Sequence, residues 1–315
     1  MKQSEKIFIA AAEEQSLVKA AKRSFVTQQC VSDHIKRLEE EYGLPLFVRK
    51  PHLRLTTAGE DMLKTLKSIQ VLENNLTKNL EERKNGQLGS FTVGMSTSRA
   101  QILLPAVLTK FYRLFPDVKI YFSVNDTMIL EKELKKGTFD LMLGVNTENS
   151  PEFSFMPLAE DELYLCISAS LFAKYFSQLQ RELFLTGADL TAFQDVPFSL
   201  YYTSGALNKL IQQYLNEHRT TLRKTPYYIS DCDTHIFLCE SGLCATLIPK
   251  MLAFRLHEHN LALPPEQQVL LFPLKDFHYP IQIDMVWNKN VSLPIYAKAF
   301  CEMIKEEAER IMRAY

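Results

Sequence analysis

The chain has 315 residues, of which 46% are hydrophobic, and a formal net charge of -1 at pH 7. This length allows two or three packed units with substantial cores, and the near-neutral charge excludes a uniformly basic nucleic-acid-binding protein. No segment is long and apolar enough to span a bilayer, and the N-terminus leads into an amphipathic stretch and not a signal peptide. We therefore expect a cytoplasmic protein with no membrane partner.

The first predicted elements are two short helices joined by a tight turn. Ser16 is a candidate N-cap for a helix over about 17–24, and Thr27 for a second helix over about 28–42. Because only two residues separate the helices, they must cross steeply, and the small side chains at 20–21 let their backbones approach closely. The sequence therefore predicts a helix-turn-helix.

The second helix of this pair has one apolar and one polar face. Val31, Ile35 and Leu38 recur at i, i+4 and i+7 and form the apolar face. We expect the polar face to meet the major groove of DNA, where glutamine pairs with adenine and Ser, Lys and Arg contact phosphates. An acid on this face must accept from a cytosine amine or turn away. The candidate DNA-binding residues of this helix are Thr27, Gln28, Gln29, Ser32, Asp33, Lys36 and Arg37.

A basic hairpin is predicted after the second helix. Leu46 and Phe47 anchor it in the core, and the alternation over 49–55 indicates a two-stranded wing around Pro51. Its candidate contacts with phosphates or the minor groove are Arg49, Lys50, His52 and Arg54. Surface cations are often only solvated, but here the positive charge is local to this unit of a near-neutral chain, which favours DNA binding.

A long amphipathic helix is predicted between the wing and the rest of the chain. Its apolar residues step by three or four positions and form a stripe. The helix either lies on its own domain or pairs with a partner helix, and its polar other faces favour a partner. Asn85, Gly86 and Gly89 are expected to end it. The stripe consists of Met62, Leu66, Ile69, Leu72, Leu76 and Leu80.

From about residue 88, strands alternate with helices, and the first set of these elements predicts a parallel sheet. The first set has strands at 91–95, 118–124 and 139–145 and helices over about 100–115 and 129–136. The second set has strands at 162–168, 197–201, 227–229 and 244–248, helices over about 205–218 and 234–240, and an extension at 170–194. A strand at 284–287 and a helix over about 294–312 return to the first set. The pattern predicts two α/β lobes with a cleft between them.

Ligands in such folds sit at the carboxyl ends of strands and at helix N-termini, where free N–H groups favour an anion. Ser96, Thr97, Ser98 and Arg99 follow the first strand and open the first helix, so they form the candidate floor of a pocket. Capping or turn chemistry explains a single Ser or Thr equally well, and Arg99 can equally point outwards.

Catalysis is the rival function class for a two-lobed α/β domain. The chain has no G-x-S-x-G, no P-loop sequence and no G-x-G-x-x-G, so no enzyme activity is expected. The acidic pair Asp161-Glu162 fits a turn and needs no acid-base role. His257 and His259 have a metal-ligand spacing if the chain is extended, but no partner ligand is evident nearby. Polar surface is the favoured explanation, and neither a metal nor a cofactor is expected.

The six cysteines are scattered and form no C-x-x-C pair. They predict neither a disulfide framework nor a zinc site, and reduced, buried thiols are the expectation. A redox switch that uses two of Cys232, Cys239 and Cys244 stays open as an alternative.

The N-terminal elements together resemble the winged helix-turn-helix of LysR-type transcriptional regulators. The residues that carry the resemblance are Phe8, Ser16, Ala20, Ala21, Gln28, Val31, Ser32, Ile35, Leu38, Glu39, Gly43, Leu46, Phe47, Arg49, Leu55, Thr56, Ala58 and Gly59. Three positions depart from the family pattern, in which leucine is usual at Ser24, proline frequent at Gln29 and glycine frequent at Gln15. The first two departures concern operator specificity and not the fold.

The remainder resembles the effector-binding domain of the same family, itself similar to type 2 periplasmic binding proteins. Its landmarks are Leu104, Pro105, Phe115, Pro116, the segment 137–140, Gly242, Ile248 and Pro249. The resemblance adds Asn125, Thr127, Tyr201, Tyr202, Thr203 and Ser230 to the effector-binding residues, with a small organic anion as the expected effector. It also implies that the long helix pairs antiparallel with that of a second subunit. A homodimer or homotetramer would then bind a dyad-symmetric operator in double-stranded DNA, with RNA polymerase as a further partner.

The expected fold class is therefore α/β in three parts. These are a winged helix-turn-helix domain over 1–58, a linker and dimerisation helix over 59–87, and a two-lobed effector-binding domain over 88–315. The expected function is sequence-specific transcriptional regulation, modulated by a small-molecule effector bound between the lobes. The alternative is a DNA-binding regulator without such an effector, whose C-terminal half serves oligomerisation or thiol redox sensing.

Overall fold

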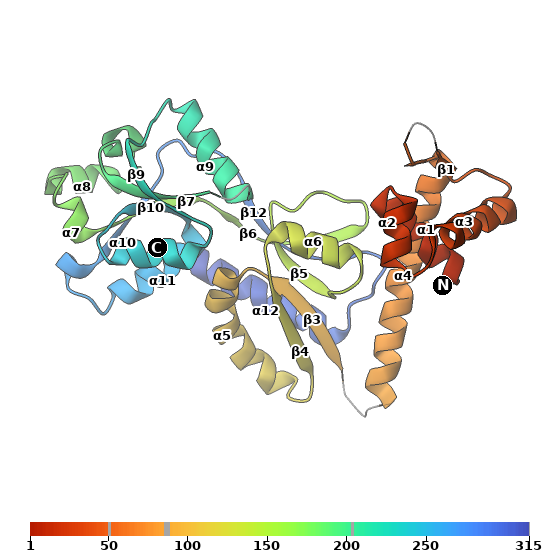
Figure 1. Cartoon of the computed structure of the whole chain (residues 1–315). Coiled ribbons are helices and arrows are strands. Elements are labelled where there is room, and N and C mark those ends of the chain that lie inside the picture. The colour runs from red at the N-terminus through yellow and green to blue at the C-terminus, as the bar shows by residue number, and fades with distance from the viewer. Residues whose placement is uncertain (50–51, 85–88, 203–204, 315) are drawn as a thin grey trace.

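The computed structural model describes residues 1–49, 52–84, 89–202 and 205–314. They form an N-terminal unit, a long helix and two α/β lobes, with the long helix between the N-terminal unit and the first lobe (Figure 1). Some predicted features lie outside the described residues: Lys50 and Pro51 of the wing, Asn85 and Gly86 at the helix end, and Thr203 of the pocket.

The N-terminal unit contains α1 (Gln3–Glu14), α2 (Leu17–Arg23), α3 (Gln28–Tyr42) and an antiparallel hairpin of β1 (Phe47–Val48) and β2 (Arg54–Leu55). Both predicted N-caps are confirmed, since Ser16 accepts from the Lys19 amide and Thr27 from the Cys30 amide. The predicted apolar face of α3 is buried in a core that also contains Phe8 and Phe47. The helix-turn-helix and its wing therefore form as the sequence predicts.

The predicted apolar stripe lies on the long helix α4 (Thr57–Lys84), and its two parts differ in burial. Leu66 is buried and Met62 half-buried against the core of the N-terminal unit. Further along, Leu72, Leu76 and Leu80 are each about half exposed, at 49%, 59% and 57%. Each of the two explanations therefore fits one part of the stripe. The first part packs against its own unit, and the second part is exposed.

Lobe I is built on a five-stranded sheet. Its strand order is β4 (Lys119–Val124), β3 (Ser90–Met95), β5 (Leu141–Val145), β12 (Ile281–Asn288) and β6 (Phe153–Asp161). Strand β3 is parallel to β4 and β5, whereas β12 is antiparallel to both its neighbours. The helices of this lobe are α5 (Thr97–Leu114), α6 (Thr127–Lys135) and α12 (Ile295–Met312). Phe91, Leu103 and Phe300 lie at the centre of its core.

Lobe II is built on a second five-stranded sheet. Its order is β11 (Val269–Pro273), β7 (Leu163–Ser168), β10 (Ala245–Pro249), β8 (Pro197–Tyr201) and β9 (Lys224–Ile229). Its helices are α7 (Ala169–Phe172), α8 (Gln178–Phe184), α9 (Ala206–Glu217), α10 (Cys232–Glu240) and α11 (Lys250–Asn260), with short 3-10 turns at Leu190–Phe193 and Pro265–Gln267. The chain crosses between the lobes from β6 to β7 and returns from β11 to β12. Within the described ranges, no helix has the length and apolar character needed to cross a membrane.

The structure adds elements that the sequence pattern did not indicate. Strands β6 and β11 and helix α11 were not predicted. His257 and His259 lie on the helix α11, so the extended spacing that a metal site would need does not occur at these residues. Residues two apart on a helix point in different directions, and His259 Nδ1 lies 2.9 Å from Glu240 Oε1. In the described part of the chain, no group of three or more potential ligands is placed to hold a metal ion.

Candidate DNA-binding surface and effector site

The polar face of α3 carries the predicted base-reading residues. Gln28, Lys36 and Arg37 are exposed on it. Gln29 Nε2 donates a hydrogen bond to Asp33 Oδ1 at 3.2 Å, so the carboxylate of Asp33 is held by its neighbour on the same helix. Asp33 therefore pairs with another candidate DNA contact on the same exposed face.

The wing is tied to α3 by Glu39, which sequence reasoning used only as a landmark. Glu39 Oε1 accepts hydrogen bonds from the Leu46 amide at 2.9 Å and the Phe47 amide at 3.2 Å. Its Oε2 lies 3.2 Å from Arg49 Nη2, so this cation is held inside the unit. His52 and Arg54 are exposed on the other side of the hairpin tip. The only local signal for this role was an acid directly after Leu38, the last residue of the apolar face.

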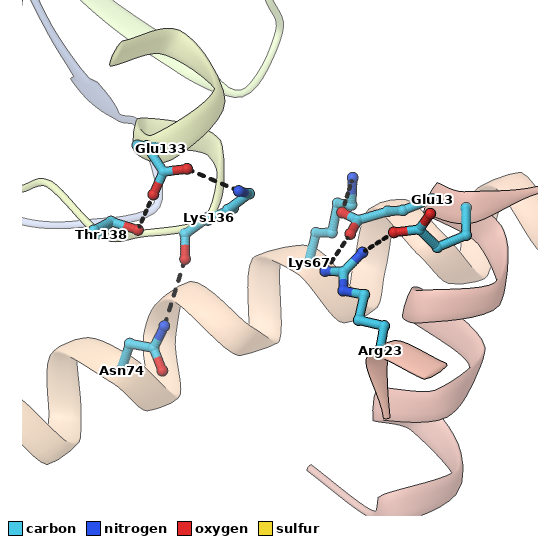
Figure 2. A network of polar contacts seen from close by, with 8 residues as sticks. Glu13, Arg23, Lys67, Asn74, Glu133, Lys136 and Thr138 are labelled. Carbon is cyan, nitrogen blue, oxygen red and sulfur yellow. Dashed lines mark hydrogen bonds and ion pairs between the residues drawn. The ribbon is translucent and has the colours of Figure 1, made fainter. Parts of the chain in front are cut away.

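A second network joins the N-terminal unit to the long helix (Figure 2). Glu13 of α1 pairs with Arg23 of α2 at 2.7 Å and with Lys67 of α4 at 3.0 Å. Burial alone would raise the pKa of Glu13, but the hydrogen bonds from Lys67 and Arg23 outweigh burial and lower that pKa. The three helices are thus held together by one ionised carboxylate.

The candidate effector site begins where two strands of lobe I end side by side. Met95 of β3 is the register partner of Val124 of β4, and the Asn125 amide donates to the Met95 carbonyl at 3.2 Å. The two segments that follow, 96–97 and 125–127, therefore open α5 and α6 at one edge of the sheet. Thr97 and Asn125 are exposed there and Thr127 is half-buried. The structure thus places these predicted residues together.

Arg99 points inwards and is only 7% exposed, so the alternative in which it points outwards is wrong. Its Nη2 lies 4.0 Å from Asp161 Oδ2. Burial lowers the pKa of Arg99 and raises the pKa of Asp161 to about 6, although Arg99 opposes the second shift. Ser96 Oγ, Arg99 Nε and Asp161 Oδ2 are buried and have no hydrogen-bond partner among the described residues. We call Ser96, Arg99 and Asp161 the polar centre.

Asp161 connects the polar centre to both lobes. It is the last residue of β6 in lobe I and lies two residues before β7 in lobe II. Its Oδ1 accepts from the Met251 amide at the start of α11 at 3.2 Å, and from the Glu162 amide at 2.9 Å. Sequence reasoning assigned Asp161 to a turn, because Arg99 and Met251 are far away along the chain.

Lobe II contributes an aromatic wall. Tyr201 is buried at the end of β8, and its ring centroid lies 4.1 Å from that of His235 on α10. Burial lowers the pKa of His235 to about 4, so this imidazole is neutral at pH 7. The thiol of Cys232 and the phenol of Tyr201 lie close enough to Arg99 to interact with its charge. Tyr202 and Ser230, the other predicted residues here, are exposed.

A second bridge between the lobes involves Ser98. Its Oγ lies 3.5 Å from Asp233 Oδ2 on α10. Arg255 of α11 joins the same group, because its Nη1 donates to Asp233 Oδ1 at 2.9 Å and to Gln101 Oε1 of α5 at 2.7 Å. Ser98 therefore faces the other lobe, and its neighbours Asp233 and Arg255 were not predicted.

Two family models account for nearly the whole chain. Residues 4–60 match the "Bacterial regulatory helix-turn-helix protein, lysR family", and residues 84–309 match the "LysR substrate binding domain". The chain belongs to the LysR family of transcriptional regulators. This LysR-family protein is thus a DNA-binding transcriptional regulator with an effector-binding domain, and the suspected resemblance is confirmed.

Relatives and solved structures agree with this assignment. A "Probable RuBisCO transcriptional regulator" of Cyanidioschyzon merolae is 29% identical over 217 residues, which are 68% of this chain and 69% of the relative. The structure of ArgP from Mycobacterium tuberculosis has a TM-score of 0.60 at 20% identity and covers 98% of this chain and 97% of its own. Full-length CbnR in complex with its target DNA has a TM-score of 0.52 at 19% identity and covers 98% and 100%. At these identities the solved structures show the shared fold of LysR-family regulators.

The cysteines of this LysR-family regulator are all free thiols. Five are buried, and burial raises the pKa of each: Cys166, Cys232, Cys239, Cys244 and Cys301. Because the thiolate is the form that oxidants attack, buried thiols with raised pKa values react slowly. The chemistry of these five residues thus disfavours the thiol-sensing alternative.

Proposed function

We propose that a small organic anion binds at the polar centre and controls how this regulator binds DNA. The observation that carries the proposal is the set of buried atoms Ser96 Oγ, Arg99 Nε and Asp161 Oδ2, which lack partners at the boundary of the two lobes. An unsatisfied buried polar group costs about 1–3 kcal/mol, so a ligand that supplies partners is favoured. A carboxylate bonded to Ser96 and Arg99 fits, with protonated Asp161 as a further donor.

The predicted residues around the polar centre then have separate roles. Thr97, Asn125 and Thr127 offer polar groups at the open edge of the sheet, and Tyr201 packs against the body of the ligand. The contact between Ser98 and Asp233 joins the two lobes, so it depends on the distance between them. Effector binding closes the lobes about Asp161, which shifts subunit packing and the spacing of the DNA-binding units.

Thermal unfolding with a panel of small mono- and dicarboxylates tests the effector site. At least one acid should raise the Tm of the wild type, and Arg99→Gln should abolish that rise. Thr127→Ala should weaken it and serves as a second variant if Arg99→Gln folds poorly. Arg113→Gln is the matched control, because Arg113 is exposed at the far end of the same helix. No stabilisation by any acid, or full stabilisation of both site variants, would contradict the proposal.

We further propose that the exposed face of α3 reads the operator. Gln28 has the chemistry to pair with adenine, and Lys36 and Arg37 to position the helix on phosphates. Ser32 and Thr27, and in the wing His52 and Arg54, are proposed as further phosphate or groove contacts. To reach DNA, Gln29 would have to leave Asp33, Lys36 would have to leave Glu40, and Arg49 would have to leave Glu39. Asp33 would likewise have to leave Gln29.

Fluorescence anisotropy on a duplex selected from a random library, and on its scrambled form, tests the DNA surface. Gln28→Ala should cost about 1–3 kcal/mol of discrimination between the two duplexes. Lys36→Ala should weaken both equally and reduce the salt slope by about 0.9. Lys64→Ala, an exposed change on α4, is the matched control. Wild-type discrimination in Gln28→Ala together with a wild-type salt slope in Lys36→Ala would contradict this surface.

We also propose that the chain acts as a homodimer or homotetramer. The exposed part of the α4 stripe, Leu72, Leu76 and Leu80, is the surface that a second α4 would cover in antiparallel pairing. Two α3 helices would then meet a dyad-symmetric operator. In this proposal the three functional parts are 1–58, 59–87 and 88–315, and RNA polymerase is a further partner of the DNA-bound regulator.

A further inference from the structure

We propose that the turn after α6 positions the DNA-binding unit by packing against the long helix of its own chain. We call the contact of Lys136 and Gly137 with Val71 and Asn74 the coupling contact. The inference rests on the proposed effector site, because α6 begins at Thr127 beside the polar centre. An effector bound at the start of α6 would change the coupling contact at the end of this helix.

The coupling contact is close and specific. Val71 is only 2% exposed, although Leu72 next to it is half exposed. A Cβ atom on Gly137 would lie 3.2 Å from Val71 Cγ2 and 3.3 Å from Val71 Cα, and Gly137 has a φ of +73°. Asn74 Nδ2 donates to the Lys136 carbonyl oxygen at 3.4 Å (Figure 2). A residue with a side chain would be strained at 137 and would press on α4, so glycine suits both the turn and the contact.

The turn that makes this contact is held in shape by Glu133. Its Oε1 lies 2.8 Å from Lys136 Nζ, and its Oε2 accepts from Thr138 Oγ1 at 3.0 Å (Figure 2). The hydrogen bond from Lys136 is the main cause of a lowered pKa at Glu133, so this carboxylate stays ionised. Backbone bonds from Gly137 to Leu134 and from Thr138 to Glu133 complete the turn. The turn can therefore move as one piece with α6.

Helix α6 is a short rod between the two sites. Its nine residues span about 13 Å at 1.5 Å per residue. Leu130 and Leu134 are fully buried, and a Cβ atom on Gly94 of β3 would lie only 2.6 Å from Leu130 Cδ2. Strand β3 leads into Ser96 of the polar centre. Because packed interiors deform little, a shift of this strand or of Thr127 must displace the whole helix and the turn at its end.

Beyond the coupling contact, α4 leads to the DNA-binding unit. One turn before Val71, Lys67 pairs with Glu13, which also holds Arg23 at the end of α2. A cavity of about 230 Å³, lined in part by Lys136, Gln70 and Arg23, separates the α6 turn from the DNA-binding unit. In this proposal the linker helix carries the displacement towards α3.

Thermodynamic reciprocity allows a test without the effector, since DNA bound at α3 must then act back on α6. Hydrogen exchange is measured on the full chain with and without a duplex selected from a random library. DNA should slow exchange in peptides that cover 127–137 of the wild type by at least about fivefold. Val71→Asp should lose this response while peptides over 28–42 stay protected by DNA, and Asn74→Ala should reduce it. Thr65→Asp adds the same charge at an exposed position of α4 and should behave as wild type.

Two results would overturn the inference. One is a wild type in which DNA leaves exchange at 127–137 unchanged. The other is a full slowing of exchange by DNA at 127–137 in the variants Val71→Asp and Asn74→Ala. If Val71→Asp misfolds or no longer binds DNA, the result for Asn74→Ala decides. Stabilisation by carboxylates is measured separately and depends on Arg99. A chain that keeps that stabilisation but shows no response of α6 to DNA therefore contradicts the coupling contact alone.

Discussion

The ionisation of Asp161 should leave a measurable mark on stability. Two effects compete at this carboxyl: burial favours the neutral acid, while Arg99 and the amides of Met251 and Glu162 favour the carboxylate. Burial wins, because Arg99 Nη2 is 4.0 Å away and Asp161 Oδ2 accepts no hydrogen bond from the described residues. The pKa of Asp161 is therefore raised from 3.8 to about 6.

The sign and size of the effect follow from proton linkage. At pH values below 3.8 the carboxyl is protonated in both the folded and the unfolded state and its ionisation costs nothing. Above about pH 6 it is ionised in both states, and the folded state bears the full cost. A shift of about two units, at 1.36 kcal/mol per unit, amounts to about 3 kcal/mol. Relative to Asp161→Asn, the wild type should thus lose about 3 kcal/mol of unfolding free energy between about pH 3 and about pH 7.

Urea unfolding at a series of pH values measures this difference. Trp287 on β12 of lobe I is the only tryptophan in the chain, so its fluorescence reports on the lobe that contains Asp161. Asp117→Asn is the control, because Asp117 is exposed and that variant should keep a constant offset from the wild type. A constant offset for Asp161→Asn would refute the reasoning. A wild type that gains on Asp161→Asn as pH rises would show that Arg99 outweighs burial.

Three further predictions concern the N-terminal unit and the long helix. Glu39→Ala should cost about 1–3 kcal/mol in chemical unfolding, because two amides of the wing lose their acceptor, whereas the exposed Glu40→Ala should change little. Gly59→Ala should lower the Tm by several degrees, since its Cβ would collide with the carbonyl oxygen of Leu46. Leu76→Glu should shift sedimentation towards monomer, and an unchanged mass would exclude the α4 stripe as the dimer surface.

Local signals allowed much of the N-terminal unit to be predicted. Ser16 and Thr27 are N-caps whose partners lie three residues away, and the apolar face of α3 repeats within four residues. Such features depend on neighbours in sequence, so a single chain displays them. The alternation of strands and helices likewise indicated the two lobes, because each element carries its own apolar pattern.

The features that were missed depend on distant partners. Strand β6 is paired with β12, and Asp161 finds its register partner in Ile281. The direction of Arg99 is set by the same Asp161, and the burial of Val71 by Gly137. Nothing within a few residues of these positions distinguishes them from an ordinary turn, a solvated cation or one more apolar residue on a helix. The sequence therefore placed the candidate residues at one sheet edge, where the structure brings them together, but it did not predict the buried pair of Arg99 and Asp161 beside them.

In the proposed effector site, the polar centre would join proton uptake, anion binding and lobe movement in one group. An anion beside ionised Asp161 meets a like charge, whereas a protonated Asp161 can donate to it, so anion affinity should rise as pH falls through about 6. Asp161 Oδ1 also caps the start of α11 through Met251, so a change in its charge acts on lobe II as well. A ligand that draws Arg99 away from Asp161 would thus weaken an ion pair within lobe I, and through the bond from the Met251 amide to Asp161 it would also act on the tie to lobe II. The lobe angle would then depend on which partner Arg99 holds.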